Sequence, residues 1–293
     1  MTQHISKYGN GRRIVIVDAG STKTHARILS RVSGEAEETV SMAAVNPVHL
    51  SEEELDNRLS PLATVLRSDD DVAYFGAGCL PGVPSERVAA SLRRIGAAGS
   101  VSVDSDIVAA ALALFGEKEG IACILGTGSN TAYVSGGEVR SSVPSLGYVL
   151  GDEGSGAAIG RRLLRSVLRS ELPQELIEAF ETETSQTLSD VIENLYRRPT
   201  PNRYLAQFTY FVAKHIDTRE IRQIVRDEFA VLFVNQVTRY PQYRYLPIGF
   251  VGSVAKVFEK VLRDVAEEFE CSVSAIYESP MEGLTEYFKS TGK

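Results

Sequence analysis

Two short segments rich in small residues carry the groups that phosphate binding needs. In Asp18–Thr24 (DAGSTKT), a carboxylate ends an apolar run and is followed at once by small, hydroxyl and lysine side chains. Small residues let several backbone N–H groups converge on one anion, because little side chain blocks close approach. We expect phosphate donors at Gly20, Ser21, Thr22 and Lys23, with the hydroxyl of Thr24 as a further donor.

Asp18 has a different expected task, because a carboxylate cannot favourably contact phosphate. It is suited to hold hydrated Mg²⁺, an ion that keeps most of its water ligands in proteins. The segment lacks the GxxxxGK[ST] pattern of a P-loop, and no GxGxxG opens a helix after it. Taken alone, it also fits an ordinary hairpin turn without a ligand.

A second segment of this kind is Gly126–Asn130 (GTGSN), which also follows an apolar run. Matching Gly20–Ser21 to Gly128–Ser129 gives an internal repeat with an offset of 108 residues. Each copy consists of a strand, a small turn and a return strand, which predicts a duplicated α/β domain. Two turns that face each other across a cleft would hold one nucleotide polyphosphate from both sides.

Polar residues at three places in the chain have both a structural and a functional interpretation. Asp104 and Asp106 flank a predicted strand-to-helix junction, where each fits an N-cap or an acceptor for a substrate proton. Asp152, or its neighbour Glu153, precedes a helical pattern and equally fits a cap. Asn46 stands before a proline and fits a turn.

The elements that must position these residues follow from hydrophobic periodicity and turn signals. Strands are predicted at 13–18, 24–30, 72–75, 101–103, 121–125, 131–135, 248–251 and 272–276. Helices are predicted from a capping box at Ser51 to about 66, then at 85–95, 107–115, 253–269 and 281–289, with helical pattern through 154–240. The arginines of one such helix are expected on its solvated face: Arg161, Arg162, Arg165 and Arg169.

Composition narrows the class of protein. The 293 residues include 43% hydrophobic residues, which is typical of a globular protein. The formal net charge is −7, so the chain lacks the overall positive charge that would attract nucleic acid or an anionic membrane. No apolar run is long enough to span a bilayer, and no secretory signal opens the chain. Three scattered cysteines favour a reducing compartment. We expect a cytoplasmic protein.

Six segments in order resemble the N-acetylglucosamine kinase-like family of BadF/BadG-type ATPases: DAGSTKT, FGAGC, SDIVAAALALFG, LGTGSN, GYVLGDEGSG and GFVGSVA. The resemblance runs from about Val15 to Gly283. That family belongs to the superfamily of sugar kinases, heat-shock ATPases and actin. It implies an α/β fold of two ribonuclease-H-like domains with ATP in an interdomain cleft. We expect residues 12–117 with a returning C-terminal helix, 281–293, in the first domain, and 118–280 in the second.

The resemblance also implies roles for individual residues. Asp106 matches the general base, and Asp104 is the alternative to it. ATP and Mg²⁺ are the implied cofactors, and the expected ATP contacts are Gly20, Ser21, Thr22, Lys23, Thr127, Gly128, Gly252 and Ser253. The expected substrate is a small amino sugar, contacted by Asn46, Asp106, Ser129, Asn130, Ser145, Leu146, Gly147 and Asp152.

The chain departs from the family pattern at Leu146, which stands where the animal kinase has an aromatic residue that covers the sugar. This leaves the identity of the sugar open between N-acetylglucosamine, phosphorylated at its 6-hydroxyl, and a relative such as a muramic derivative. A branch that uses an iron–sulphur cluster is excluded, because Cys79, Cys123 and Cys271 are not closely spaced. A non-catalytic sugar or nucleotide sensor is the competing class. The sequence is compatible with a homodimer but does not require one.

Overall fold

The computed structural model describes residues 7–292; residues 1–6 and Lys293, the last residue of the expected C-terminal segment, lie outside this range. The chain divides into two compact units. Unit 1 contains the described chain up to Lys118, Gly136–Glu138 and the chain from Pro280 onward. Unit 2 contains Glu119–Ser135 and Val139–Ser279.

Unit 1 is built on a mixed sheet with the strand order β3-β2-β1-β4-β5. The central strand β1 reads RIVIVDA and is almost entirely buried, as a strand covered on both faces must be. It pairs antiparallel with β2 and parallel with β4, and β4 pairs parallel with β5. The strands are β1 (Arg13–Ala19), β2 (Lys23–Ser30), β3 (Ala36–Ala43), β4 (Asp71–Gly76) and β5 (Val101–Ser105).

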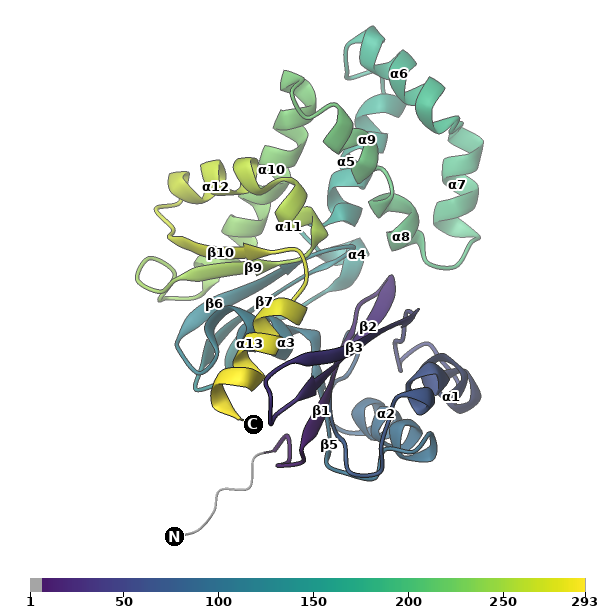
Figure 1. Ribbon diagram of the computed structural model, residues 1–293. Helices are drawn as coiled ribbons and strands as arrows, with labels where there is room; N and C mark the ends of the chain where they lie inside the picture. The colour runs from purple at the N-terminus through teal and green to yellow at the C-terminus, as the bar shows by residue number, and fades with distance from the viewer. Residues whose placement is uncertain (1–6, 293) are drawn as a thin grey trace. The chain divides into compact units, whose positions relative to one another are not determined.

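Two helix pairs cover the two faces of this sheet. On one face, α3 (Asp106–Phe115) and α13 (Met281–Thr291) lie side by side (Figure 1). Their backbones approach closely at Gly283, where an added Cβ would lie 2.4 Å from the carbonyl oxygen of Ala113. Arg27 of β2 also binds α13, donating to Glu282 at 2.7 Å. The C-terminal helix is therefore part of unit 1.

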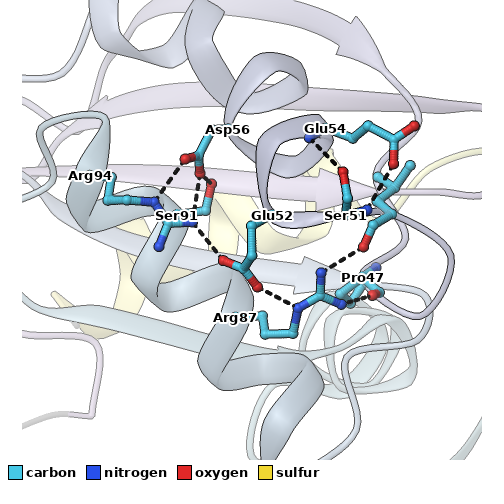
Figure 2. Close-up of polar contacts among 9 residues, drawn as sticks. Pro47, Ser51, Glu52, Glu54, Asp56, Arg87, Ser91 and Arg94 are labelled. Atoms are coloured by element: carbon cyan, nitrogen blue, oxygen red, sulfur yellow. Dashed lines mark hydrogen bonds and ion pairs between the residues drawn. The ribbon is translucent and has the colours of Figure 1, made fainter.

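The other face is covered by α1 (Glu52–Leu59), the short 3₁₀ segment η1 (Ser60–Thr64) and α2 (Val83–Arg94). The predicted capping box is confirmed: Ser51 Oγ accepts from the Glu54 amide, and Glu54 accepts from the Ser51 amide. Figure 2 shows how α2 binds α1: Arg94 donates to Glu52 and Asp56, both at 2.8 Å. Hydrogen bonds from Arg87 and Arg94 lower the pKa of the Glu52 carboxyl, and hydrogen bonds from Arg94 and Ser91 lower that of Asp56.

Unit 2 repeats the same sheet, in the order β10-β9-β6-β7-β8. Its central strand β6 pairs antiparallel with β7 and parallel with β9. The strands are β6 (Gly120–Leu125), β7 (Ser129–Ser135), β8 (Glu138–Val143), β9 (Ile248–Val251) and β10 (Val273–Tyr277). The α/β class with two ribonuclease-H-like units is thereby confirmed.

Helices fill the long interval between β8 and β9 and cover the sheet of unit 2 (Figure 1). They include α4 (Gly147–Leu150), α5 (Gly156–Leu168), α6 (Gln174–Thr184), α7 (Leu188–Tyr196), α8 (Pro201–Ala206), α9 (Thr209–Lys214) and α10 (Arg219–Asn235), with the 3₁₀ turn η2 (Val237–Arg239). After β9 come α11 (Ser253–Val257) and α12 (Glu259–Glu268). No helix within residues 7–292 is long and apolar enough to cross a membrane.

The strand registers correct the repeat offset. Ala19 ends β1 and Leu125 ends β6, which gives an offset of 106 residues rather than 108. Val72 pairs with Val15 and Ile248 pairs with Ile121, so once β1 and β6 are aligned at this offset, their partner strands make Gly76 equivalent to Gly252. Gly20 therefore corresponds to Gly126, and the match to Gly128 was wrong by two residues. The first turn is one residue longer than the second, which the residue types alone do not reveal.

Two further findings differ from the sequence-based expectations. The edge strands β3 and β8 were not predicted, because their exposed sequences AEETVSMA and EVRSSV lack an apolar face. Arg162 was expected in solvent, but its guanidinium donates to the buried carboxylate of Glu228 at 2.6 Å. Arg161, Arg165 and Arg169 are exposed, as expected.

Candidate active site

Three aspartates lie at or just beyond the carboxyl edge of the unit 1 sheet. Across three neighbouring strands, Asp18 pairs with Phe75 and Phe75 pairs with Asp104. Two strand spacings therefore separate Asp18 from Asp104, which is about 10 Å between backbones. Asp106 follows two residues later, as the first residue of α3. The sequence prediction of a carboxylate at this strand-to-helix junction is confirmed.

Asp106 has the environment of a proton acceptor. Its side chain is partly enclosed, and burial raises the pKa of its carboxyl, although hydrogen bonds from the Ile107 amide and from its own amide oppose the shift. A raised pKa increases the basicity of the carboxylate, which favours general-base catalysis. Asp106 is not a helix cap, because the N-cap of α3 is Ser105.

Asp104, the alternative base, is already engaged. Its Oδ1 accepts from Lys7 Nζ at 3.0 Å, and its Oδ2 accepts from Ser102 Oγ at 3.2 Å. The geometry therefore favours Asp106 as the base.

The turn between β1 and β2 contains the first set of expected phosphate donors. The Gly20 amide donates to the Lys23 carbonyl at 3.0 Å, which closes the turn. Gly20 and Ser21 are half-buried, whereas Thr22 and Lys23 are exposed. Thr24 does not join them: its side chain is fully buried, and its hydroxyl has no hydrogen-bond partner.

Asp18 is half-buried at the end of β1, beside this turn. Among residues 7–292, no group of three or more His, Cys, Asp or Glu side chains is placed to hold a metal. A single hard carboxylate oxygen at this edge fits an ion that takes its remaining ligands from water and substrate, as Mg²⁺ does. The residues present are thus compatible with a hydrated Mg²⁺ and not with a site made wholly of protein ligands.

Asn46 is held on two sides. Its Oδ1 accepts from the Val48 amide at 3.0 Å, so the predicted turn before the proline is present. An added Cβ on Gly78, which has a φ of +80°, would lie 2.4 Å from the same oxygen. Arg87 of α2 donates to the carbonyl of Pro47 at 2.5 Å and thereby fixes the loop that follows (Figure 2).

In unit 2 the glycine turn between β6 and β7 is bound to the start of α5. The Gly156 amide donates to the Gly126 carbonyl at 2.8 Å, and the Ala157 amide donates to the Thr127 carbonyl at 3.1 Å. These hydrogen bonds occupy two carbonyl oxygens that would otherwise repel a bound anion. The amides of Thr127 and Gly128 make no hydrogen bond within the part of the chain that is described, and both residues are half-exposed.

Asp152 lies directly against this turn. Its Oδ1 accepts from the Ser129 amide at 3.3 Å, and an added Cβ on Gly128 would lie 3.0 Å from its Oδ2. Asp152 also has a φ of +57°, a conformation that is rare for residues other than glycine. Burial raises the pKa of its carboxyl, and the Ser129 amide opposes this. The cap of α5 is Ser155, so neither Asp152 nor Glu153 caps the helix.

Sequence reasoning missed two residues of this cluster. Gln236 is buried and donates to Glu153 at 2.7 Å and to Ser129 Oγ at 3.3 Å. Asn235 donates to the other oxygen of Glu153 at 3.1 Å. Both residues come from the end of α10, more than eighty positions away, and no local pattern marks them. They fix the segment that carries Asp152.

The remaining predicted residues of unit 2 lie in different surroundings. Ser145 Oγ lies 3.4 Å from the Ser129 carbonyl, and Leu146 and Gly147 are exposed at the start of α4. The alternation of β7 directs Asn130 to the face opposite Ser129, so the structure does not bring these two side chains together. Gly252 follows β9 and Ser253 begins α11, and an added Cβ on Gly252 would lie 2.2 Å from the Leu125 carbonyl oxygen.

Comparison with known proteins assigns the chain to a family. No protein-family model and no curated protein matches the chain. Among solved structures, a Porphyromonas gingivalis protein provisionally named as an N-acetylglucosamine kinase is 37% identical, with a TM-score of 0.89 over 96% of this chain and 100% of that one.

The chain belongs to the N-acetylglucosamine kinase-like family.

Two more distant structures share the fold of this N-acetylglucosamine kinase-like chain. A Chromobacterium violaceum protein with the same provisional name is 20% identical, with a TM-score of 0.70 over 95% of this chain and 99% of that one. A Streptomyces griseus glucokinase of the ROK family, solved with glucose and AMPPNP, is 15% identical, with a TM-score of 0.53 over 94% and 97%. The family resemblance drawn from the sequence motifs is confirmed.

Proposed function

We propose that the protein is an ATP-dependent kinase of amino sugars that phosphorylates N-acetylglucosamine at its 6-hydroxyl. One observation carries the proposal: a carboxylate of raised pKa begins α3 at the carboxyl edge of the unit 1 sheet, in a chain of the N-acetylglucosamine kinase-like family. Because ATP is the phosphoryl donor, we expect the reaction in the cytoplasm.

Asp106 accepts the proton of the attacking hydroxyl in the proposed mechanism. The oxygen then attacks the γ-phosphorus of ATP in line with the leaving ADP, and the proton stays on the carboxyl until the product leaves. Most of the rate gain in such a transfer comes from positioning and charge stabilisation. The fixed position of Asp106 at the start of α3 contributes to positioning.

Backbone and hydroxyl donors bind the nucleotide. In unit 1 the proposed donors are Ser21 and Thr22, with the ammonium of Lys23, and Gly20, whose amide closes the turn on the Lys23 carbonyl, lets the phosphate approach closely; in unit 2 they are Thr127 and Gly128, whose amides have no acceptor within residues 7–292. Gly252 and Ser253 are proposed on the adenosine side. Mg²⁺ would neutralise part of the phosphate charge, and the Asp18 carboxylate would hold the hydrated ion.

The proposed sugar contacts are polar groups that hydrogen bonds hold within each unit. Asp152 and the backbone around Ser129 form one polar cluster in unit 2, and Ser145 and Gly147 stand beside it. Asn46 supplies an amide from unit 1, held by Gly78 and by the Arg87–Pro47 hydrogen bond. Asn130 and Leu146 remain proposed contacts on the basis of the family motif alone.

A substrate panel tests this proposal. The protein, Mg²⁺ and ATP are incubated with N-acetylglucosamine, N-acetylmannosamine, glucosamine, glucose and N-acetylmuramic acid, and ADP release is measured. We expect sugar-dependent ADP release that is fastest with an N-acetylated sugar, and phosphorus NMR of the product should show a 6-phosphate. Tight binding of sugar and ATP without ADP release would instead identify a sensor.

A further inference from the structure

The turn that follows α10, residues 236–240, directs two buried polar side chains onto β7. Gln236 donates to Ser129 Oγ at 3.3 Å. Four residues later, Tyr240 Oη lies 2.9 Å from Thr131 Oγ1 and shares a hydrogen bond with it. Ser129 and Thr131 are both buried and lie on one face of β7, because successive residues of a strand point to opposite faces. The turn is therefore fixed to the strand that carries the Ser129 backbone.

Tyr240 also holds the end of β8. The amide of Val143, the last residue of this strand, donates to Tyr240 Oη at 3.0 Å. Tyr240 is only 3% exposed and belongs to the apolar core of unit 2. Burial raises the pKa of its phenol, although hydrogen bonds from Thr131 and Val143 oppose the shift. The phenol therefore keeps its proton at neutral pH, and one uncharged oxygen joins β7 to the end of β8.

The segment 144–147, which is expected to contact the sugar, begins directly after β8. All four of its residues are exposed, so packing contributes little to its position, which depends on hydrogen bonds. Within the segment, Ser145 Oγ donates to a carbonyl of β7 at 3.4 Å, near the limit for a hydrogen bond. Just beyond it, Arg161 donates to the carbonyl of Tyr148 at 2.5 Å. The attachment at the β8 end is Tyr240.

We propose that Tyr240 is a positioning residue for sugar binding: through the Val143 amide it holds segment 144–147 in the conformation that binds the sugar. This inference rests on the proposed kinase function. Without the hydroxyl, the Val143 amide loses this acceptor, and the segment is free to leave that conformation. The sugar affinity then falls in proportion to the fraction of molecules in which the segment is correctly placed. Once the sugar is bound, the base and the nucleotide donors are unaltered, so kcat and ATP binding stay the same.

The test compares three substitutions in unit 2 with the native protein. Tyr240→Phe removes the hydroxyl and keeps the ring. Two matched controls each remove a side-chain hydrogen bond but leave Val143 bound: Thr131→Val removes the partner on β7, and Tyr204→Phe removes a hydroxyl that donates to a glutamine in the helical interval at 2.7 Å. The kcat and the KM values for N-acetylglucosamine and ATP are measured, and amide hydrogen exchange of residues 143–151 is followed by mass spectrometry.

We expect Tyr240→Phe to raise the KM for N-acetylglucosamine about five- to tenfold, the size of one lost hydrogen bond. Its kcat and its KM for ATP should stay within about twofold of the native values, and residues 143–151 should exchange faster. Both controls should resemble the native protein. A higher sugar KM at unchanged kcat reports lost binding, whereas a general loss of structure changes all three constants and lowers the melting temperature.

Three kinetic results would overturn the inference. They are a native sugar KM in Tyr240→Phe, a parallel change of all three constants in that variant, and an equal rise of the sugar KM in Thr131→Val.

Failure of the kinase proposal gives a different result. If the native protein phosphorylates no sugar, the proposed function is wrong, and calorimetry with N-acetylglucosamine replaces the kinetics for the same four proteins. Weaker sugar binding in Tyr240→Phe than in both controls, with faster exchange of residues 143–151, supports the positioning role. Absence of sugar binding by the native protein, or equal exchange in all four proteins, contradicts it.

Discussion

The two units share one sheet topology but present different chemistry at the same edge. With the register offset of 106 residues, Asp18 of β1 corresponds to Ile124 of β6. Asp104 of β5 corresponds to Tyr277 of β10, and Asp106 corresponds to Ser279. The three aspartates of unit 1 thus have no acidic counterpart in unit 2.

Unit 2 differs from unit 1 in its hydrogen bonds. Its turn at Gly126–Gly128 is bound to the start of α5, and its long helical interval supplies Gln236, which donates to both Glu153 and Ser129. In the proposed mechanism, proton transfer and metal binding depend on side chains of unit 1, and ligand positioning in unit 2 depends on the backbone and on buried hydrogen bonds. Substitutions should separate these two contributions.

The largest expected effect is at Asp106. Asp106→Asn removes the proton acceptor while keeping the shape of the side chain, so kcat should fall by about 10²- to 10⁴-fold. Asp104→Asn, measured under the same conditions, should lose much less, because Asp104 is paired with Lys7. Near-native turnover of Asp106→Asn together with an inactive Asp104→Asn would move the base to Asp104.

The next effect is on stability and tests the equivalence of the two sheets. Gly252→Ala places a Cβ 2.2 Å from a backbone oxygen of β6, at a φ of +129°, and should lower the free energy of unfolding of unit 2 by about 3 kcal/mol. The control is Gly82→Ala, whose φ is +95° with nothing within 4 Å. It should cost only the backbone strain, about 1 kcal/mol. Equal losses of unfolding free energy in the two variants, measured by urea unfolding, would show that the close contact at Gly252 does not contribute.

A third prediction separates nucleotide from sugar within one turn. An added Cβ on Gly126 meets no atom within 4 Å, so Gly126→Ala should leave the melting temperature unchanged and raise the KM for ATP, by about tenfold if a phosphate uses that space. Gly128→Ala presses on Asp152 and also alters a residue whose amide is proposed to bind ATP, so it should raise the KM for the sugar as well as that for ATP. The kinetic constants of both variants decide this, and a sugar KM that rises equally in both would contradict it.

The smallest predicted effect is the pH dependence of the rate. Burial raises the pKa of Asp106, and only the ionised carboxylate accepts a proton. The activity should therefore fall as the pH drops through this raised pKa, with a midpoint above the ordinary aspartate value of about 4. The pH profile of kcat/KM for native protein and Asp104→Asn should share this limb. A midpoint that shifts in Asp104→Asn would assign the titration to Asp104.

Much of this arrangement follows from the sequence because its signals are local. The apolar strands β1, β6 and β9, the capping box at Ser51 and the junction at Asp106 are each specified by residues within a few positions. The edge strands β3 and β8 were missed because most of their residues are exposed, and the repeat was matched two residues away because Gly126 and Gly128 are each followed by a hydroxyl residue. Gln236 depends on a long-range contact that a single sequence does not encode locally.

The central claim, that catalysis depends on carboxylates of unit 1 and nucleotide positioning on the backbone of unit 2, is tested most directly by ATP affinity. Calorimetry on Asp106→Asn and Gly126→Ala in the same buffer measures the Kd of ATP for each. We predict that Asp106→Asn binds ATP within about twofold of the native protein, although it no longer transfers phosphate, and that Gly126→Ala binds about tenfold more weakly. Weakened binding in Asp106→Asn with native affinity in Gly126→Ala would contradict the account.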